Sequence, residues 1–339
     1  MILTYKIRHG RDFSRELFLA RKVAEFALQY KSQTTKDVKH FGLKAQISNQ
    51  ILRKYSRSKT IKSVGSVKLT INGYFVKIVD EQIKIPCLKL VLPIFFDKSF
   101  TKINQVEVGK QFAYISVSYK EPPIIKPEQV IGVDRNTKHH VLVASNICTG
   151  KVLKLGKECH HIHDKYKNMR RGFQKQGKLT MVKKVKDRES KIIRNLNHHI
   201  SKALVLEARD SNAVLVFEDL KDIRQTAKQR KKQRYSLHSW SFYQLGQMVE
   251  YKSKKFGVPV AYVEPQYTSQ RCSKNGCGHI DANNRKGNLF RCTKCGAVED
   301  SGANAGFNIA YLCQQGIPRF NTDRDVLKGS TDTPREATP

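Results

Sequence analysis

Hydrophobic positions in the first third of the chain change from a helical to a strand-like pattern. Residues 1–10 alternate as in a strand, and apolar residues over 12–30 recur at helical spacing. A second helix is expected over 44–55. From about 62 to 119 short β-rich runs follow one another, and the Asn-Gly pair at 72–73 is typical of a hairpin turn. This pattern predicts a small barrel or sandwich, fed by the first strand and interrupted by helices.

The remainder of the chain, after a Glu-Pro-Pro boundary at 121–123, alternates strands and helices. Short apolar runs predict four strands, over 130–134, 140–145, 213–217 and 258–263. A strongly basic stretch over 151–200 predicts a helical hairpin, and a further helix is expected over 241–256.

Charge changes this picture of an ordinary α+β protein. The chain has 339 residues, and its 63 Lys and Arg against 29 Asp and Glu give a formal net charge of +34. Hydrophobic residues still make up 39%, so a folded core is expected. Positive charge along the whole chain favours nucleic acid as the partner, through neutralisation of its phosphates. Acidic lipid is the alternative, although it prefers charge concentrated in one helix or tail.

The chain shows no sign of membrane insertion or secretion. No apolar stretch approaches the roughly 20 residues that a membrane-spanning helix needs. The first residues, MILTYKIRHGRDFSREL, become charged after a short apolar start, unlike a secretory signal. We therefore expect a cytoplasmic protein.

Four of the eight cysteines lie in one short segment: Cys272, Cys277, Cys292 and Cys295. Four clustered thiolates can form a tetrahedral zinc shell, each pair on a tight turn. Gly278 and Gly296 directly follow the second cysteine of each pair, where the turn favours a residue without a Cβ. Two disulfides or a redox Cys-x-x-Cys are the alternatives, and a reducing cytosol disfavours the first. We expect one structural Zn²⁺.

Three acids follow an apolar strand or precede a helix. Asp134 ends VIGVD, Glu218 ends VLVFE, and Asp300 lies in VEDSGANAGFNIA. Converging carboxylates at strand ends can bind two Mg²⁺ ions, which activate water and stabilise a leaving oxygen. The simpler interpretation of each acid alone is a solvated cap.

Two basic groups are candidate nucleic-acid contacts. They comprise a loop-like group, Lys228, Arg230, Lys231, Lys232 and Arg234, and a helical group, Arg170, Arg171 and Lys175. A solvated surface is the alternative, but the overall charge favours contacts with phosphates, which carry no sequence information.

Several motifs together resemble one family. They are IGVDRNTKHHVLVA, LVFEDLKDIR, YSLHSWSFYQL, YKSKKFGVPVAYVEPQYTSQRC and GANAGFNIA. In this order, and with the cysteine cluster, they resemble TnpB, the transposon-encoded RNA-guided nuclease, and through it the type V CRISPR effectors. The resemblance covers about 130–312 and implies a prokaryotic, nucleoid-associated protein.

The resemblance implies an α+β multidomain fold. An N-terminal β-barrel wedge domain would carry inserted recognition helices at about 11–60, and a C-terminal RNase H-like (RuvC) α/β domain would be interrupted by a zinc ribbon. The implied boundaries are 1–125 for the wedge barrel, 126–268 for the first RuvC-like part, 269–298 for the ribbon, 299–313 for the last RuvC-like helix and 314–339 for a disordered tail.

The resemblance also assigns the acids. Asp134 would be the first catalytic acid and Glu218 the second, both as Mg²⁺ ligands. The family's third acid lies two residues before the Asn that is Asn304 here, and that position is Gly302. Asp300 is two residues early, so the chain is either a nuclease that uses Asp300 or one that has lost its activity.

The resemblance implies guide RNA and double-stranded target DNA as partners, with one chain for each guide RNA. The implied activity is RNA-guided DNA binding, with Mg²⁺-dependent cleavage if the acidic site is complete. A nuclease-dead RNA-guided repressor is the alternative. A guide-free zinc-ribbon DNA-binding protein is the second alternative, and it would need neither the strand-end acids nor the motif order.

Overall fold

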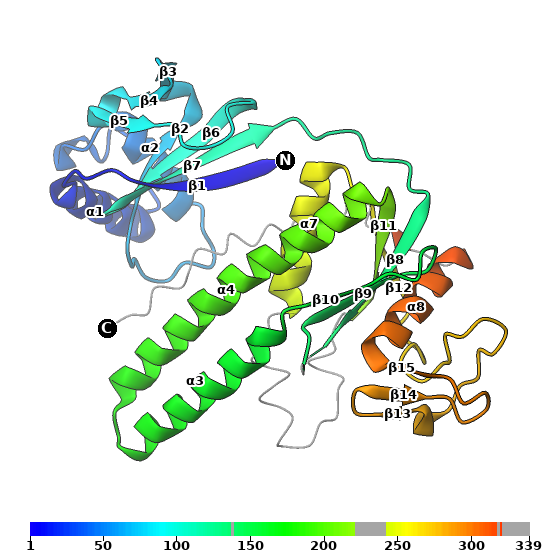
Figure 1. Cartoon of the computed structure of the whole chain (residues 1–339). Helices are drawn as coiled ribbons and strands as arrows, with labels where there is room; N and C mark the ends of the chain where they lie inside the picture. The colour runs from blue at the N-terminus through cyan, green and yellow to red at the C-terminus, as the bar shows by residue number, and fades with distance from the viewer. Residues whose placement is uncertain (137–138, 221–241, 317–318, 321–339) are drawn as a thin grey trace. The chain divides into compact units, whose positions relative to one another are not determined.

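A computed structural model describes residues 1–136, 139–220, 242–316 and 319–320 (Figure 1). The loop-like basic group and most of the expected tail lie outside the described residues. Contacts within the chain divide it into two compact units, with the boundary between Lys120 and Glu121. Within the described residues, no helix is long and apolar enough to cross a membrane.

The first unit is built on a four-stranded antiparallel sheet. Its strands follow the order β1 (Ile2–Arg8), β7 (Phe112–Tyr119), β6 (Phe100–Val108) and β2 (Leu69–Asn72). Alternate residues of β7 are buried, as expected for a sheet with one face in the core. The helices α1 (Ser14–Tyr30) and α2 (Ala45–Tyr55) pack on each other and on β2, in agreement with the predicted helices.

A second, smaller sheet completes the first unit. It contains β3 (Lys77–Val79), β4 (Gln82–Ile85) and β5 (Leu90–Pro93). The predicted hairpin turn at 72–73 is wrong, because β2 pairs with β6 rather than with β3. Asn72 instead caps a 3₁₀ turn over Gly73–Phe75, its side chain accepting a hydrogen bond from the Tyr74 N–H. The backbone at position 73 lies so close to β6 that only glycine fits, since a Cβ there would lie 1.8 Å from the Ile103 backbone oxygen.

The second unit contains a six-stranded mixed sheet. Its order is β10 (Val152–Leu155), β9 (Leu142–Asn146), β8 (Gln129–Arg135), β11 (Ala213–Glu218), β12 (Val260–Val263) and β16 (Arg319–Phe320). β8, β11 and β12 are parallel to one another, while the other three strands are antiparallel to their neighbours. The strand β10 was not predicted, because the basic stretch that contains it was assigned entirely to helices.

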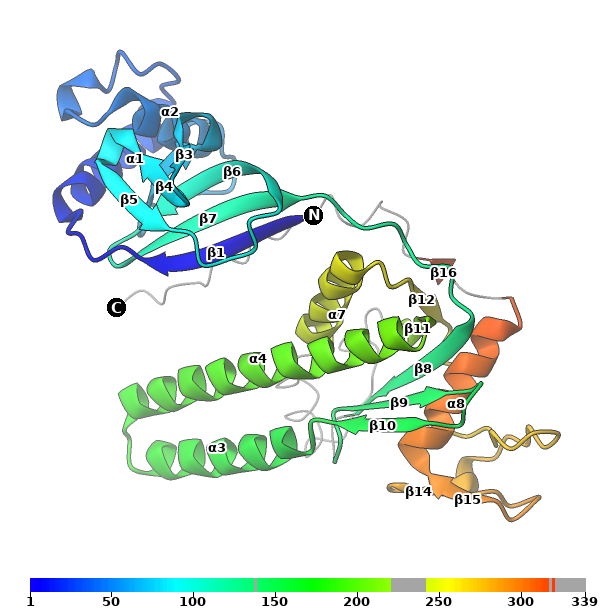
Figure 2. The same cartoon turned by 45° about the horizontal axis from the view of Figure 1, so that its top comes forward.

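Helices cover both faces of this sheet (Figure 2). α4 (Leu179–Asp210) and α7 (Phe242–Phe256) cover one face, where Leu204 and Leu245 share a core cluster with Leu215. α8 (Ser301–Gln314) covers the other face, where Ile309 packs with Val216. α3 (Lys157–Lys175) pairs with α4 as the predicted helical hairpin.

A small sheet lies between α7 and α8 in sequence. It comprises β13 (Arg285–Lys286), β14 (Leu289–Arg291) and β15 (Val298–Asp300). Its core is Phe290, packed with Cys272 and Cys292. With several sheets and helices on both faces of the largest, the expected α+β class is confirmed.

Candidate functional site

Two parallel strands bring Asp134 and Glu218 together. β8 and β11 pair with Phe217 opposite Val133, so the next step along both strands places Glu218 beside Asp134. Neighbouring strands lie about 4.8 Å apart, and the two carboxylates repel each other. Val133 and Phe217 pack in the core cluster under α4 and α7. Since side chains alternate along a strand, both acids face α8.

Asp134 is buried, with only 6% of its surface exposed. Burial, followed by the negative charge of Glu218, raises the pKa of Asp134 to about 7. Asn136 partly opposes this rise, since its Nδ2 donates to Asp134 Oδ2 at 2.7 Å, and Arg285 and Arg135 also lower the pKa. A buried carboxylate with too little positive charge around it favours either a proton or a bound cation.

Glu218 is held by groups from three parts of the second unit. Burial raises its pKa, while a hydrogen bond from Thr268 Oγ1 and the charges of Arg135 and Arg285 lower it, with a net rise. Arg135 Nη2 also donates to the backbone oxygen of Glu218 at 2.8 Å. Asn308 of α8 anchors the Thr268 loop, its Nδ2 donating to the Thr268 oxygen at 2.9 Å. Strand, loop and helix therefore position this carboxylate together.

Asp300 is the N-cap of α8. Its Oδ1 accepts from the backbone N–H groups of Gly302 and Ala303, both at 3.1 Å, and its Oδ2 lies 3.0 Å from Lys154 Nζ. Burial raises the pKa of Asp300, but the hydrogen bond from Lys154 and the helix N–H groups outweigh burial and lower it. The carboxylate is thus engaged through both of its oxygens.

Glycines let α8 lie close to the sheet next to the acid pair. A Cβ at Gly132 would lie 1.9 Å from the Gly306 oxygen, and a Cβ at Gly302 would lie 2.8 Å from Val143 Cγ2. Val143 is the direct partner of Asp134 across β8 and β9. Position 302 therefore faces the row of residues that contains Asp134, but it carries no side chain there.

The three acids do not together form a ligand set for a single ion. Across the described part of the chain, the only set of three or more Cys, His, Asp or Glu ligand atoms close enough for one ion is that of the four cysteines. Asp134 and Glu218 lie side by side across β8 and β11, whereas the carboxylate of Asp300 contacts Lys154 and the start of α8.

The four cysteine Sγ atoms all lie within 4.8 Å of one another. The Sγ separations are 3.8 Å for Cys272–Cys295 and 3.7 Å for Cys277–Cys292, too long for the roughly 2.05 Å bond of a disulfide. Four thiolates about 2.3 Å from one zinc would be about 3.8 Å apart at the corners of a tetrahedron. The cluster is consistent with structural zinc, and the disulfide alternative is wrong.

The three residues of the helical basic group differ in their contacts and exposure. Arg170 donates from Nη1 to the buried carboxylate of Glu189, which also lies 2.6 Å from His163 Nδ1. Arg171 and Lys175 are exposed on α3. Arg170 therefore contributes to the packing of α3 against α4, whereas Arg171 and Lys175 are left exposed to solvent.

Asn136 and Lys154 are among the polar residues at the acid edge that the sequence did not single out. Asn136 follows Asp134 by two residues at a strand end, a spacing that could have suggested a partner for the carboxylate. Lys154 lies in the unpredicted strand β10, and the alternation of VLKL was the available signal.

Comparisons with known proteins show which family the sequence resembles. Residues 242–309 match the family described as Cas12f1-like, TNB domain. The chain is 30% identical over 271 residues to a TnpB-like protein of Methanocaldococcus jannaschii, covering 76% of this chain and 86% of that protein. It is 27% identical over 244 residues to a TnpB-like protein of Aquifex aeolicus, covering 63% of this chain and 78% of that protein.

Similarity extends to CRISPR-associated nucleases. The chain is 27% identical over 216 residues to CRISPR-associated endodeoxyribonuclease Cas12f1 of Sulfoacidibacillus thermotolerans, covering 58% of this chain but 49% of that protein. Among solved structures, a Cas12f1–sgRNA–target DNA complex matches with a TM-score of 0.45 at 18% identity, covering 91% of this chain and 99% of that chain. On the extent and identity of the match to the Methanocaldococcus protein, this chain belongs to the TnpB-like protein family.

Proposed function

We propose that this chain binds double-stranded DNA under the direction of a guide RNA, and that its acid edge cleaves DNA slowly or not at all. The observation that carries the second part is that, among the described residues, no third Cys, His, Asp or Glu ligand atom lies close enough to Asp134 and Glu218 to share one ion with both. Position 302 is a glycine, and the carboxylate of Asp300 is engaged by Lys154 and by the N-terminus of α8.

Nucleic-acid binding is supported by family membership together with charge. A net charge of +34 is large for 339 residues, and it destabilises the free chain unless polyanions neutralise it. Phosphate contacts supply affinity without sequence preference, whereas base pairing between guide and target supplies specificity. In this proposal Arg171, Lys175 and the loop-like basic group contact the nucleic-acid backbone.

The proposed domains follow the two units. The sheets and helices of the first unit would form the wedge barrel with its recognition helices within 1–125. The second unit would be the RuvC-like domain, in parts 126–268 and 299–313, with the zinc ribbon at 269–298 between them. The mixed sheet, with strand-end acids and helices on both faces, supports this assignment.

The acid pair fits one Mg²⁺ ion better than two. Asp134 and Glu218 offer hard oxygen ligands, and the elevated pKa values of both carboxyls indicate a site in need of positive charge. Asn136 and Thr268 would keep the two carboxylates oriented. In a two-metal nuclease, the bound ions supply an activated water and stabilise the leaving oxygen. Among the residues that the structure describes, none brings a third carboxylate close enough to share an ion with this pair.

The alternative, an active nuclease that uses Asp300, needs a larger change. Asp300 would have to leave two backbone N–H groups of α8 and Lys154 at once. An N-cap alone typically contributes about 1 kcal/mol to stability. The interactions of Asp300 therefore favour a chain that binds DNA without cleaving it efficiently.

The test begins with RNA that copurifies with the full chain. That RNA is sequenced, its guide segment is redesigned, and binding to matched and mismatched duplexes is measured by gel shift. We expect binding that requires the matched guide and weakens steeply with salt. Equal affinity for DNA with and without RNA would contradict the proposal and favour a guide-free DNA-binding protein.

A further inference from the structure

Four side chains form a row across the sheet beneath α8. Asp134 pairs with Val143 across β8 and β9, and Val143 pairs with Lys154 across β9 and β10. Glu218 follows Asp134 on the other side, one step beyond the Phe217–Val133 pair. Direct partners in a sheet point to the same face, so the row Glu218, Asp134, Val143, Lys154 lies on the face covered by α8.

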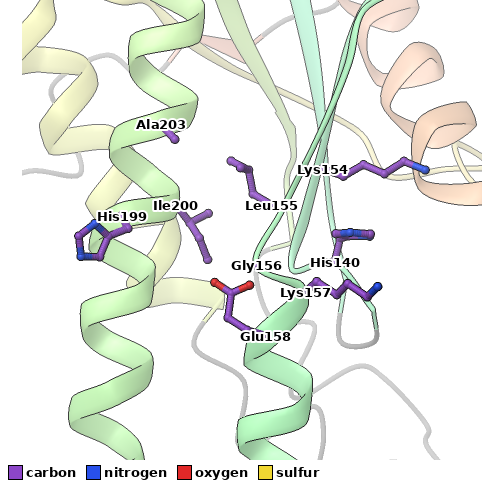
Figure 3. Close-up of a pocket in the computed structure, with 9 residues that line it drawn as sticks. All are labelled: His140, Lys154, Leu155, Gly156, Lys157, Glu158, His199, Ile200 and Ala203. Atoms are coloured by element: carbon purple, nitrogen blue, oxygen red, sulfur yellow. The ribbon is translucent and has the colours of Figure 1, made fainter.

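Lys154 extends from β10 toward α8 (Figure 3). A pocket of about 330 Å³ lies beside β10, and Lys154, Glu158 and His199 are among the residues that line it. The Lys154 ammonium meets Asp300, with side-chain exposures of 36% and 29%. The side chains of this ion pair are only partly exposed, so water screens their charges less than it would screen fully exposed charges.

Gly302 lies over the middle of the row. Its Cα directs any added Cβ onto Val143, between the acid pair and Lys154. Moving along the row, the face therefore presents two carboxylates, an apolar residue, and an ammonium ion. The Lys154 ammonium therefore lies beyond Gly302, the position of α8 from which a second cation beside Asp134 would need a ligand.

We propose that Lys154 is a built-in counter-cation of the acid row. It holds Asp300 at the helix cap and, by repulsion between like charges, opposes a second divalent cation, so that the edge takes one such ion between Asp134 and Glu218. This inference rests on the part of the proposed function that concerns the acid pair. It is independent of RNA guidance, because it concerns the metal stoichiometry of the chain itself.

The test is a titration of the full, zinc-loaded chain with Mn²⁺, followed by electron paramagnetic resonance and calorimetry without nucleic acid. We expect one Mn²⁺ per unmodified chain, lost in Asp134→Asn. Lys154→Met should bind Mn²⁺ about tenfold more tightly or take up a second ion, because a positive charge roughly 10 Å away is removed. Lys154→Gln, which keeps a donor for Asp300 without the charge, should tighten binding of the first ion.

Lys157→Met is the matched control, since it removes an equal charge from an exposed residue in the first turn of α3. It should leave the stoichiometry and affinity unchanged. The double variant Lys154→Met/Asp300→Asn should lose any second ion gained by Lys154→Met. Two Mn²⁺ ions on the unmodified chain, or equal effects of the Lys154 and Lys157 substitutions, would overturn the inference. Guided DNA binding by the unmodified chain would survive that result.

Discussion

Two residues, Asp134 and Gly302, determine how much negative charge the acid edge carries. Asp134 is a carboxylate buried beside another, and Gly302 is a missing side chain at the place where a third would reach the same row. The first has a measurable thermodynamic consequence and the second a steric one, so both can be tested without nucleic acid.

Asp134 should make stability fall as pH rises. Its pKa rises from 3.8 to about 7 on folding, so between these values the folded chain holds a proton that the unfolded chain has released. The free energy of unfolding from this group therefore decreases across that window. In Mg²⁺-free buffer, Asp134→Asn should be more stable than the unmodified chain by about 1–3 kcal/mol at pH 8, and the difference should shrink toward pH 4. Denaturant unfolding at several pH values checks this, and a difference independent of pH would contradict it.

Gly302→Asp alone should be destabilised. The added Cβ would lie 2.8 Å from Val143 Cγ2 and 3.2 Å from Val143 Cβ, and overpacking of this kind costs about 1–3 kcal/mol. Combining it with Val143→Ala should recover part of the stability and place a carboxylate beside Asp134. Gly302→Ala/Val143→Ala is the matched control, with the same Cβ and no carboxylate. We expect Mg²⁺-dependent DNA cleavage by Gly302→Asp/Val143→Ala and none by Gly302→Ala/Val143→Ala. Equal cleavage by the two double variants would show that the added carboxylate is not what matters.

At the scale of elements, the cysteine cluster and α8 are mechanically linked. Asn304 at the start of α8 donates from Nδ2 to the Arg271 oxygen at 2.8 Å and accepts from the Ser273 N–H at 3.0 Å. Both contacts flank Cys272. Order at the cluster should therefore extend through this loop to Thr268 and Glu218.

Cys272→Ser should lose zinc and loosen the loop that carries Thr268. Metal binding supplies folding free energy in such modules, so the helix start and the loop lose a common anchor. Elemental analysis should find one zinc in the unmodified chain, and hydrogen exchange should accelerate over 267–273 in the variant. Cys148→Ser, at an exposed cysteine outside the cluster, is the control and should retain zinc. Absence of zinc from reduced, unmodified protein would contradict the assignment.

Neighbouring arginines on α3 should behave differently. Arg170 is paired with buried Glu189. Removing one partner of a buried ion pair lowers the free energy of unfolding by about 3–5 kcal/mol. Arg170→Ala should lower the melting temperature, whereas Arg171→Ala should leave it unchanged and weaken RNA binding with a shallower salt dependence. Thermal melts and salt-dependent binding of the two variants separate these roles. Equal loss of RNA affinity without loss of stability would show that Arg170 also contacts RNA.

At the scale of the whole molecule, strong periodicity and motif order made most of the fold predictable. The helices α1 and α2, the strands β8 and β11, and the cysteine cluster were all visible as local patterns. β10 was missed because four residues of alternation were hidden in a basic helical stretch. The Asn-Gly turn was misassigned because Gly73 serves a tertiary approach to β6, which a local pattern does not report.

The candidate site was predictable only in part for a similar reason. Strand order and register bring Asp134 and Glu218 together, and apolar strands that end in acids indicated both. The partnership of Lys154 with Asp300 depends on a strand and a helix cap that are far apart in sequence. No spacing rule would have joined them.

One assay on one sample measures guided DNA binding and DNA cleavage together. The chain, loaded with a redesigned guide, is incubated with a matched DNA duplex and Mg²⁺, and bound complex and cut product are quantified together. We expect a stable, guide-dependent complex, and cleavage at least about a hundredfold slower than that by Gly302→Asp/Val143→Ala. Rapid cutting by the unmodified chain, abolished by Asp300→Asn, a substitution that preserves the helix cap, would contradict this expectation.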